Sequence, residues 1–234
     1  MKPFVSVVTP TYNRRKFLPA MIECYKSQTY PKDRMEWIIL DDGTDCVKDV
    51  FEDLKIPNLK YIRLDSKLLI GAKRNILNKE AVGDIVVAMD DDDFYSEERV
   101  SHVVQKFGQN PKIELAGASE IYMYYTDNKK IYKFGPYSPT HATNGTLAYR
   151  KSYGKAHLYD ETVPNAEERS FLDNYKHPMI QLDTFKVMLV LSHSENTFDK
   201  KAMRDKPNPF IKETSMKMKA FIKSAALRNF YSTA

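Results

Sequence analysis

Cysteine is rare in this chain of 234 residues, which contains only Cys24 and Cys46. One lies in an expected helix and the other follows an expected turn, which argues against a disulfide framework and against a cysteine-based metal site. We expect both thiols to be free. Long apolar runs are lacking too, because none approaches the length of a bilayer-spanning helix and the amino end lacks the apolar core of a signal peptide. The sequence therefore predicts a cytoplasmic protein.

Glycine is also scarce, and none of the eight glycines belongs to a G-x-G-x-x-G fingerprint or to a P-loop. This absence argues against a dinucleotide redox cofactor and against a Walker-type phosphate site. The net charge of +5 is modest and the basic residues are spread along most of the chain, so nothing indicates nucleic acid binding.

The most informative feature is a run of four aspartates at positions 90–93, which directly follows the apolar residues 85–89. Such an apolar run without alternation predicts a strand that is buried on both faces. Four adjacent carboxylates repel one another unless a cation shares their site. Acidic runs are more often solvated loops, but those seldom follow a buried strand. We therefore expect a divalent metal site here.

The first half of the sequence alternates strand and helix patterns. Apolar runs at 4–8, 36–40, 60–64 and 85–89 predict strands, and amphipathic segments at 15–29, 71–82 and 96–107 predict helices. Gly83 is expected to end the second helix as a C-cap. This order is typical of an α/β protein in which crossover helices join parallel strands.

After residue 111 the pattern changes. We expect a hairpin of strands at 121–125 and 131–134, a strand at 147–149, a helix at 166–175 and a last strand at 187–191. The second half is thus predicted to be mixed and partly antiparallel. No repeat or low-complexity linker appears, so residues 1–200 are expected to form one domain.

Residues 201–234 form a basic extension in which Met218, Phe221, Ile222 and Ala225 recur at helical spacing. This spacing predicts a basic amphipathic helix. Such a helix either packs on the domain and shows its lysines to solvent, or it makes a peripheral contact with an anionic membrane surface. We favour packing on the domain.

Polar clusters follow three expected strands, at 9–14, 41–44 and 90–93. Ligands of open α/β sheets bind at the carboxyl ends of the strands, so these clusters should converge. A metal on the acidic run, together with Lys73 and Arg74, would neutralise a diphosphate without a glycine loop. The competing interpretation of these two basic residues is a solvated helix face.

Several segments together resemble family two of the glycosyltransferases, which are inverting nucleotide-sugar enzymes of the GT-A fold. The resemblance spans about residues 3–200, and its segments are VSVVTPTYNR at 5–14, SQTYP at 27–31, WIILDDG at 37–43, GAKRN at 71–75 and MDDDDFY at 89–95 with Arg99. It implies a Rossmann-like, mostly parallel central sheet with helices on both faces. Residues 1–110 would then be the nucleotide-binding half, and residues 111–200 the acceptor half.

The resemblance also implies roles for donor-binding residues. Pro10, Thr11, Tyr12 and Asp42 should surround the nucleotide base, and Arg14 belongs to the same loop. Asp42 would accept a hydrogen bond from a ring N–H, which suits uracil and hence a UDP-sugar. Lys73 and Arg74 would approach the ribose or the diphosphate. The competing interpretation of Asp42 is an ordinary turn after a strand.

Within the acidic run the register of the D-x-D pair stays open, because Asp90 with Asp92 and Asp91 with Asp93 both fit. The resemblance ranks Asp92 first as the metal ligand and places Asp91 by the ribose. Asp90 would bind metal or cofactor and be partly structural, and Asp93 would orient its neighbours or the acceptor. Mn²⁺ or Mg²⁺ suits an oxygen-rich site of this kind. His193 is either a further contact to the metal or diphosphate, or a structural residue.

An inverting transfer needs a base that removes the proton of the acceptor hydroxyl. The family carries an acidic pair at the start of a helix at this distance from the metal site, and here it is Glu167 and Glu168. The resemblance implies that Glu168 is the base and Glu167 an acceptor contact, although the second position is more commonly Asp. Alternatively, both glutamates only complement the positive end of the helix dipole.

The sequence therefore predicts a metal-dependent inverting transferase that moves a sugar from a UDP-sugar to a hydroxyl of a glycan, glycolipid or glycoprotein. A nucleotidyltransferase acting on sugar phosphates also uses paired carboxylates and a metal, but it would need a glycine-rich loop near the amino end. A non-catalytic module that binds nucleotide sugars or glycans would have no need of a base.

Overall fold

The structure is a computed structural model that describes residues 2–196 and 198–234. Its α-helices are α1 (Leu18–Lys26), α2 (Lys48–Glu52), α3 (Ile70–Glu80), α4 (Arg99–Gln109), α5 (Lys151–Ala156), α6 (Glu168–Phe171), α7 (Lys200–Asp205) and α8 (Ala225–Thr233). Its strands are β1 (Val5–Thr11), β2 (Met35–Asp41), β3 (Leu59–Arg63), β4 (Ile85–Ala88), β5 (Phe94–Tyr95), β6 (Leu115–Gly117), β7 (Ile121–Tyr125), β8 (Lys130–Phe134), β9 (Ala148–Arg150), β10 (Met179–Gln181), β11 (Met188–Ser192) and β12 (Ile211–Glu213). Short 3-10 helices are η1 (Arg15–Phe17), η2 (Lys32–Arg34), η3 (Asn144–Thr146), η4 (Asp173–Tyr175), η5 (Thr184–Lys186) and η6 (Met218–Ala220).

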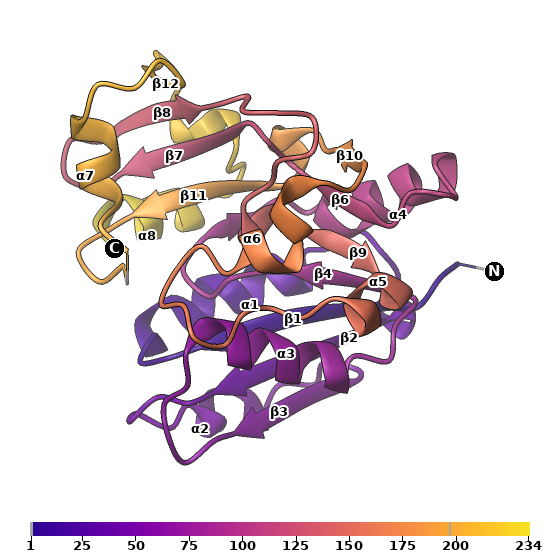
Figure 1. Ribbon diagram of the computed structural model, residues 1–234. Coiled ribbons are helices and arrows are strands. Elements are labelled where there is room, and N and C mark those ends of the chain that lie inside the picture. Colours follow the sequence, from indigo (N-terminus) through magenta and orange to yellow (C-terminus); the bar gives the residue numbers. More distant parts are fainter. Residues whose placement is uncertain (1, 197) are drawn as a thin grey trace.

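A central sheet of seven strands, in the order β10-β6-β9-β4-β1-β2-β3, forms the body of the fold (Figure 1). β1 is parallel to both neighbours, so that Val5 lies opposite Ile85 of β4 on one side and Met35 of β2 on the other. β3 continues in parallel beyond β2, whereas β9 is antiparallel to β4 and β6. The carboxyl ends of β1, β2 and β4 therefore lie along one edge. The predicted mostly parallel sheet is confirmed.

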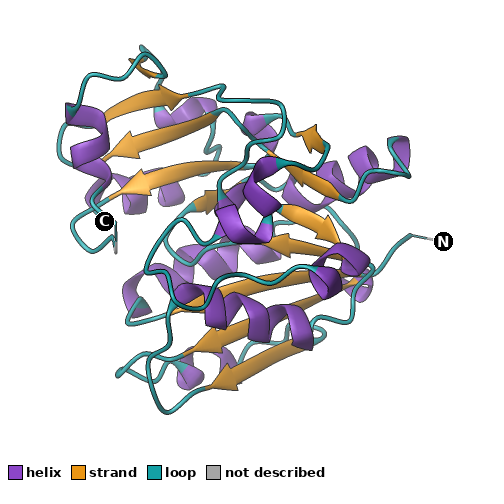
Figure 2. Cartoon of the chain, in the orientation of Figure 1, coloured by secondary structure: helices purple, strands orange, loops and turns teal. Residues whose placement is uncertain are grey.

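Helices cover both faces of the central sheet (Figure 2). Val7 and Val87 pack with residues of α1 and α4 on one face. Val8 and Val86 pack with Leu77 of α3 on the other face. Neighbouring residues of a strand point to opposite faces, so a run that is apolar at every position must be covered on both sides. The predictions of strands buried on both faces and of helices on both faces are confirmed.

A second sheet has the order β12-β8-β7-β11-β5. β7 and β8 form the predicted antiparallel hairpin, with Ile121 opposite Phe134. β11 is parallel to β7 and antiparallel to β5. Since β5 directly follows the acidic run at 90–93, the second sheet begins at the predicted metal site. The prediction of a mixed second half is confirmed.

The helix predicted at 166–175 is interrupted. α6 ends at Phe171, and Asp173, Asn174 and Tyr175 then have positive φ angles of 46°, 55° and 63°. This left-handed backbone conformation cannot continue a right-handed helix. The strands β6, β10 and β12 were not predicted, because three residues are too few to show a periodicity.

Gly83 is not the C-cap that we predicted. α3 ends at Glu80, and its C-cap, Ala81, has an extended backbone. A Cβ atom at Gly83 would lie 2.5 Å from the backbone nitrogen of Ser6. Glycine is therefore required there because the chain passes close to β1.

The carboxyl-terminal segment is not the single amphipathic helix that its spacing predicts. Pro207 and Pro209 interrupt it, since proline cannot continue a helix, and the segment forms α7, β12, η6 and α8 instead. Met218, Phe221 and Ile222 are at most 8% exposed and belong to the main core. Their apolar surface packs on the domain and is unavailable to a membrane. Within the described residues, none of the helices has both the length and the apolar character needed to cross a bilayer.

Candidate functional site

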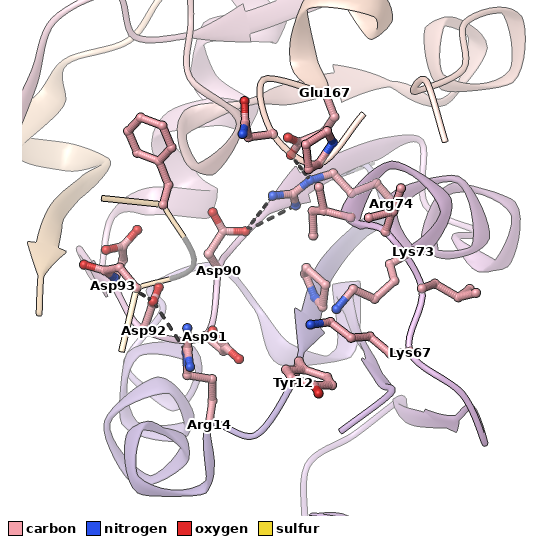
Figure 3. Close-up of a pocket in the computed structure, with 18 of the residues that line it drawn as sticks. Tyr12, Arg14, Lys67, Lys73, Arg74, Asp90, Asp91, Asp92, Asp93 and Glu167 are labelled. Carbon is pink, nitrogen blue, oxygen red and sulfur yellow. Dashed lines mark hydrogen bonds and ion pairs between the residues drawn. The ribbon is translucent and has the colours of Figure 1, made fainter. Parts of the chain in front are cut away.

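A cavity of about 490 Å³ opens where β1 and β4 end (Figure 3). It lies among the loop after β1, the segment leading into α3, the acidic run, the loop before α6 and the segment after β11. Of the residues predicted for the site, those that line it are Pro10, Tyr12, Arg14, Lys73, Arg74, Asp90, Asp91, Asp92, Asp93 and Glu167. Thr11, Asp42, Glu168 and His193 do not line it. The polar clusters at the ends of β1 and β4 thus converge as predicted.

At one side of the cavity, Lys73 covers the carboxylate of Asp42. Lys73 Nζ donates to Asp42 Oδ1 at 2.8 Å, and the backbone N–H of Leu68 donates to Asp42 Oδ2 at 2.8 Å. The Asp42 side chain is fully buried, so its carboxylate does not face the cavity. Asp42 was predicted to meet the nucleotide base, and in the structure Lys73 stands between its carboxylate and the cavity. Lys73 is itself only 6% exposed, which excludes a solvated helix face.

Two lysine ammonium groups lie over the ring of Tyr12. Lys67 Nζ lies 4.2 Å from the ring centroid and Lys73 Nζ lies 5.7 Å from it (Figure 3). An ammonium group is attracted to the face of an aromatic ring at such distances. Sequence reasoning missed Lys67, because a single exposed lysine in a loop carries no periodic or motif signal.

Arg74 joins the acidic run to the loop before α6. Its Nε donates to Glu167 Oε1 at 2.8 Å, and both terminal nitrogens donate to Asp90 Oδ1 at 3.2 Å (Figure 3). The Asn144 amide oxygen, in the orientation that its neighbours favour, accepts from the same guanidinium at 2.7 Å. Burial alone would lower the pKa of Arg74, but the charges of Asp90 and Glu167 outweigh it and raise the pKa. Arg74 is therefore a buried, permanently charged link rather than part of a solvated helix face.

Asp92 faces His193. Asp92 Oδ2 lies 3.1 Å from His193 Nε2 and 3.7 Å from Arg14 Nε, and Asn196 Nδ2 donates to it at 3.2 Å. Burial disfavours the charged form of Asp92, but the hydrogen bond with His193 and the charge of Lys200 outweigh that effect and lower its pKa. Asp92 is therefore ionised at neutral pH.

The two neighbours of Asp92 behave differently. Burial, and then the charge of Asp92, raise the pKa of Asp91 to about 8. Burial also raises the pKa of Asp93 to about 7, and Asp93 Oδ1 accepts from the backbone N–H of Leu191 at 2.7 Å. The loop therefore concentrates more acidic groups than it can keep charged, which is the electrostatic situation that a bound cation relieves.

Asp92 and its partner His193 carry groups that can ligate a divalent ion. Carboxylate oxygen and imidazole nitrogen are both ligands of Mn²⁺, and carboxylate oxygen is a ligand of Mg²⁺. Across residues 2–196 and 198–234, no three or more His, Cys, Asp or Glu side chains gather around one point. An ion at Asp92 would therefore need further oxygens from water or from a diphosphate, as Mg²⁺ often has with phosphate substrates.

Glu167 and Glu168 occupy different surroundings. Glu167 is 5% exposed, lines the cavity and is bound to Arg74. Glu168 is the first residue of α6, and burial followed by the charge of Glu167 raises its pKa to about 7. A carboxyl group with such a pKa can accept a proton near neutral pH. Glu167 is the N-cap residue of α6 and makes no side-chain capping bond, and Glu168 is the acidic residue of the first turn.

Arg99, the last residue of the acidic motif, is structural in this arrangement. It is fully buried, and one terminal nitrogen donates to the backbone oxygens of Ala88 at 3.2 Å and Leu147 at 2.8 Å. These bonds join the end of β4 to the residue before β9. Arg99 therefore supports the strand that carries the aspartates.

Two relatives match the sequence in part. An uncharacterized glycosyltransferase of Haemophilus influenzae is 32% identical over 114 residues, which are 47% of this chain and 37% of the relative. The poly(ribitol-phosphate) beta-N-acetylglucosaminyltransferase TarS of Staphylococcus aureus is 32% identical over 96 residues, which are 40% of this chain and 17% of TarS. The matches thus span well under two thirds of either relative.

Solved structures share the fold. The crystal structure of S. aureus TarS 1–349 has a TM-score of 0.66 at 19% identity and covers 80% of this chain and 60% of that chain. The mannosyltransferase PcManGT of Pyrobaculum calidifontis, in complex with GDP-Man and Mn²⁺, has a TM-score of 0.67 at 15% identity and covers 89% of this chain and 66% of that chain. The predicted GT-A fold is confirmed. The family model described as glycosyl transferase family 2 matches residues 6–167, and the chain therefore belongs to glycosyl transferase family 2.

Proposed function

We propose that this chain is a metal-dependent inverting glycosyltransferase that moves a sugar from a UDP-sugar to a hydroxyl of a glycan, glycolipid or glycoprotein. The family gives the class of reaction. The observation that carries the proposal is the cavity at the ends of β1 and β4, in which cationic side chains, the ionised Asp92 and Glu167 come together. A nucleotide sugar brings a base, a diphosphate and a reacting carbon to such a site, and each has a candidate partner.

The base would lie against Tyr12 and Pro10, with Lys73 as the polar group that meets its edge. Lys73 has donors left after its bond to Asp42, because an ammonium group carries three hydrogens. The hydrogen bond to the buried Asp42 behind it holds the ammonium in place. Asp42 would thus act through Lys73 rather than by touching the base.

The diphosphate would lie between the acidic run and the basic side chains. Asp92 and His193 would hold Mn²⁺ or Mg²⁺, and Arg14 and Lys200 add positive charge along the cavity wall. A bound divalent ion would act as a Lewis acid toward the departing nucleoside diphosphate. The similar fold of PcManGT, which was solved with Mn²⁺, supports the use of a divalent ion but does not identify its ligands.

Glu168 would be the base that takes the proton from the acceptor hydroxyl as that oxygen attacks the anomeric carbon. Its raised pKa supports the assignment, since a base works best when its pKa lies near the working pH. Glu167 is a weaker candidate because its carboxylate is tied to Arg74. We propose that Glu167 contacts the acceptor while Arg74 fixes its position.

The proposal is tested by incubating the chain with a panel of UDP-, GDP- and other nucleotide sugars and Mn²⁺, and measuring the released nucleotide. UDP-GlcNAc comes first in the panel, because the structurally similar TarS was solved in complex with it. We expect release of UDP that a chelator abolishes and that Asp92→Ala removes, while Asp53→Ala, at an exposed position on the far end of α2, keeps it. A nucleotidyltransferase would instead need added pyrophosphate and would convert it and the nucleotide sugar into a nucleoside triphosphate and a sugar phosphate. Tight donor binding without any turnover would indicate a binding module.

A further inference from the structure

The carboxyl-terminal helix α8 lies against the back of the acidic run. Tyr231 is 1% exposed, and its hydroxyl donates to the backbone oxygen of Asp93 at 3.1 Å. Its ring packs edge-on against Phe94, with 6.2 Å between the ring centroids. Asp93 is therefore bound to α8 by a buried hydrogen bond, and Phe94 contacts α8 through its aromatic ring.

Asp93 is also bound to β11. Its side chain accepts from the backbone N–H of Leu191 in β11, at 2.7 Å. Asp93, the residue that follows Asp92, is thus held between β11 and α8. The position of the Asp92 carboxylate depends on the backbone of its neighbour Asp93, because only a short side chain separates that carboxylate from the chain.

α8 also reaches the second candidate metal donor. The ring of Phe230 lies 6.0 Å from that of Phe17, edge to face, and Phe17 lies 4.5 Å from the imidazole of His193. The imidazole is buried and thus has little freedom to move independently of Phe17. Two consecutive residues of α8 therefore support the two donors, which come from different elements of the fold.

We propose that α8 sets the distance between Asp92 and His193, and that Tyr231 is a positioning residue for metal binding. This inference rests on the proposed function, since it concerns the same ion. Groups that orient metal ligands from behind commonly change metal affinity when they are removed. α8 lies outside residues 6–167, the part of the chain that the family model matches, so the support comes from a segment that the family pattern does not include.

The test is Tyr231→Phe, which removes the hydroxyl and keeps the ring against Phe94. The matched control is Tyr30→Phe, because Tyr30 is 5% exposed and donates to the backbone oxygen of Pro3 at 2.7 Å, near the amino end of the chain. Mn²⁺ binding is measured by electron paramagnetic resonance in the presence of saturating UDP. Thermal unfolding and UDP binding without metal are measured alongside it.

We expect Tyr231→Phe to weaken Mn²⁺ binding by about threefold to tenfold, the effect of losing one buried hydrogen bond. UDP binding without metal should stay the same, and transfer should return toward the wild-type rate at saturating Mn²⁺. Tyr30→Phe should lose thermal stability to a similar extent but bind Mn²⁺ normally. Unchanged Mn²⁺ affinity in a folded Tyr231→Phe protein would overturn the inference.

A second variant, Phe230→Leu, independently tests the contacts that connect α8 to His193 through Phe17. It removes the ring that supports Phe17, and it should also weaken Mn²⁺ binding while UDP binding without metal is kept. If both variants bind Mn²⁺ as the wild type does, α8 is only a packing element. If the wild type itself binds no Mn²⁺ with UDP present, the proposed function fails instead, so the two failures can be told apart.

Discussion

Arg74 Nε lies 2.8 Å from Glu167 Oε1, and the terminal nitrogens of the same guanidinium lie 3.2 Å from Asp90 Oδ1. One buried side chain of α3 therefore connects the acidic run to the loop that carries the acidic pair. The arrangement couples the two halves of the cavity, since neither carboxylate can move without breaking a charge-assisted hydrogen bond.

Replacing Arg74 should destabilise the fold strongly. Arg74→Met leaves the buried Glu167 carboxylate unpaired, and breaking a buried ion pair on one side typically lowers the free energy of unfolding by about 3 to 5 kcal/mol. Adding Glu167→Gln removes the unpaired charge, so the double variant should recover part of this loss. Urea unfolding of the two variants measures the difference. A double variant no more stable than Arg74→Met would show that the pair carries little of the energy.

The register of the D-x-D pair can be resolved with two matched substitutions. Asp92→Asn should weaken Mn²⁺ binding in the presence of UDP by about tenfold or more, because the carboxylate that faces His193 becomes a neutral amide. Asp90→Asn should mainly lower the free energy of unfolding, because the Asp90 carboxylate is engaged by Arg74. Metal titrations and urea unfolding of both variants separate the two effects. The reverse pattern would place the ion at Asp90.

The part of the site that could be predicted from sequence is the part that follows from local patterns. Apolar runs predicted β1, β2 and β4. Because the carboxyl ends of parallel strands lie at one edge of a sheet, Tyr12 and Asp92 could be expected in one cavity. The break in the helix that begins at Glu168 was not predicted: Asp173 and Asn174 are residue types that adopt positive φ angles more often than most, but Tyr175, which shares this conformation, is not.

Contacts between segments that lie far apart in the sequence could not be predicted, because no local pattern indicates which segments meet. Lys73 and Asp42 both belong to recognisable segments, but nothing in either segment indicates that one covers the other. Tyr231 lies 138 positions from Asp93, the residue whose backbone it binds. The apolar spacing around Met218 predicted one helix, but the chain is not helical between η6 and α8, so these residues do not share one helix face.

Glu168 should set the pH dependence of transfer. Its carboxyl group must be deprotonated to act as a base, and its pKa is raised to about 7. The rate at saturating donor and acceptor should therefore fall as the pH drops below about 7 and level off above it. Glu168→Gln should abolish transfer and keep UDP binding, whereas Glu52→Gln, at an exposed position of α2, should change neither. Normal transfer by Glu168→Gln would remove this residue from the role of base.

Lys73 should decide which base the cavity accepts. Its ammonium can donate to a carbonyl such as O4 of uracil, but it would face the amino group that cytosine carries at that position, where two donors meet. Lys73→Met should therefore weaken UDP binding and reduce the preference for UDP over CDP by about tenfold, the effect of one lost hydrogen bond to a charged group. Lys67→Met is the matched control, because its ammonium lies over the Tyr12 ring and should affect both nucleotides alike. Calorimetric titration of wild type and both variants with UDP and CDP measures the preference. If Lys73→Met weakened both nucleotides equally, the ammonium would hold the nucleotide by charge alone, and selection of the base would have to come from another residue of the cavity.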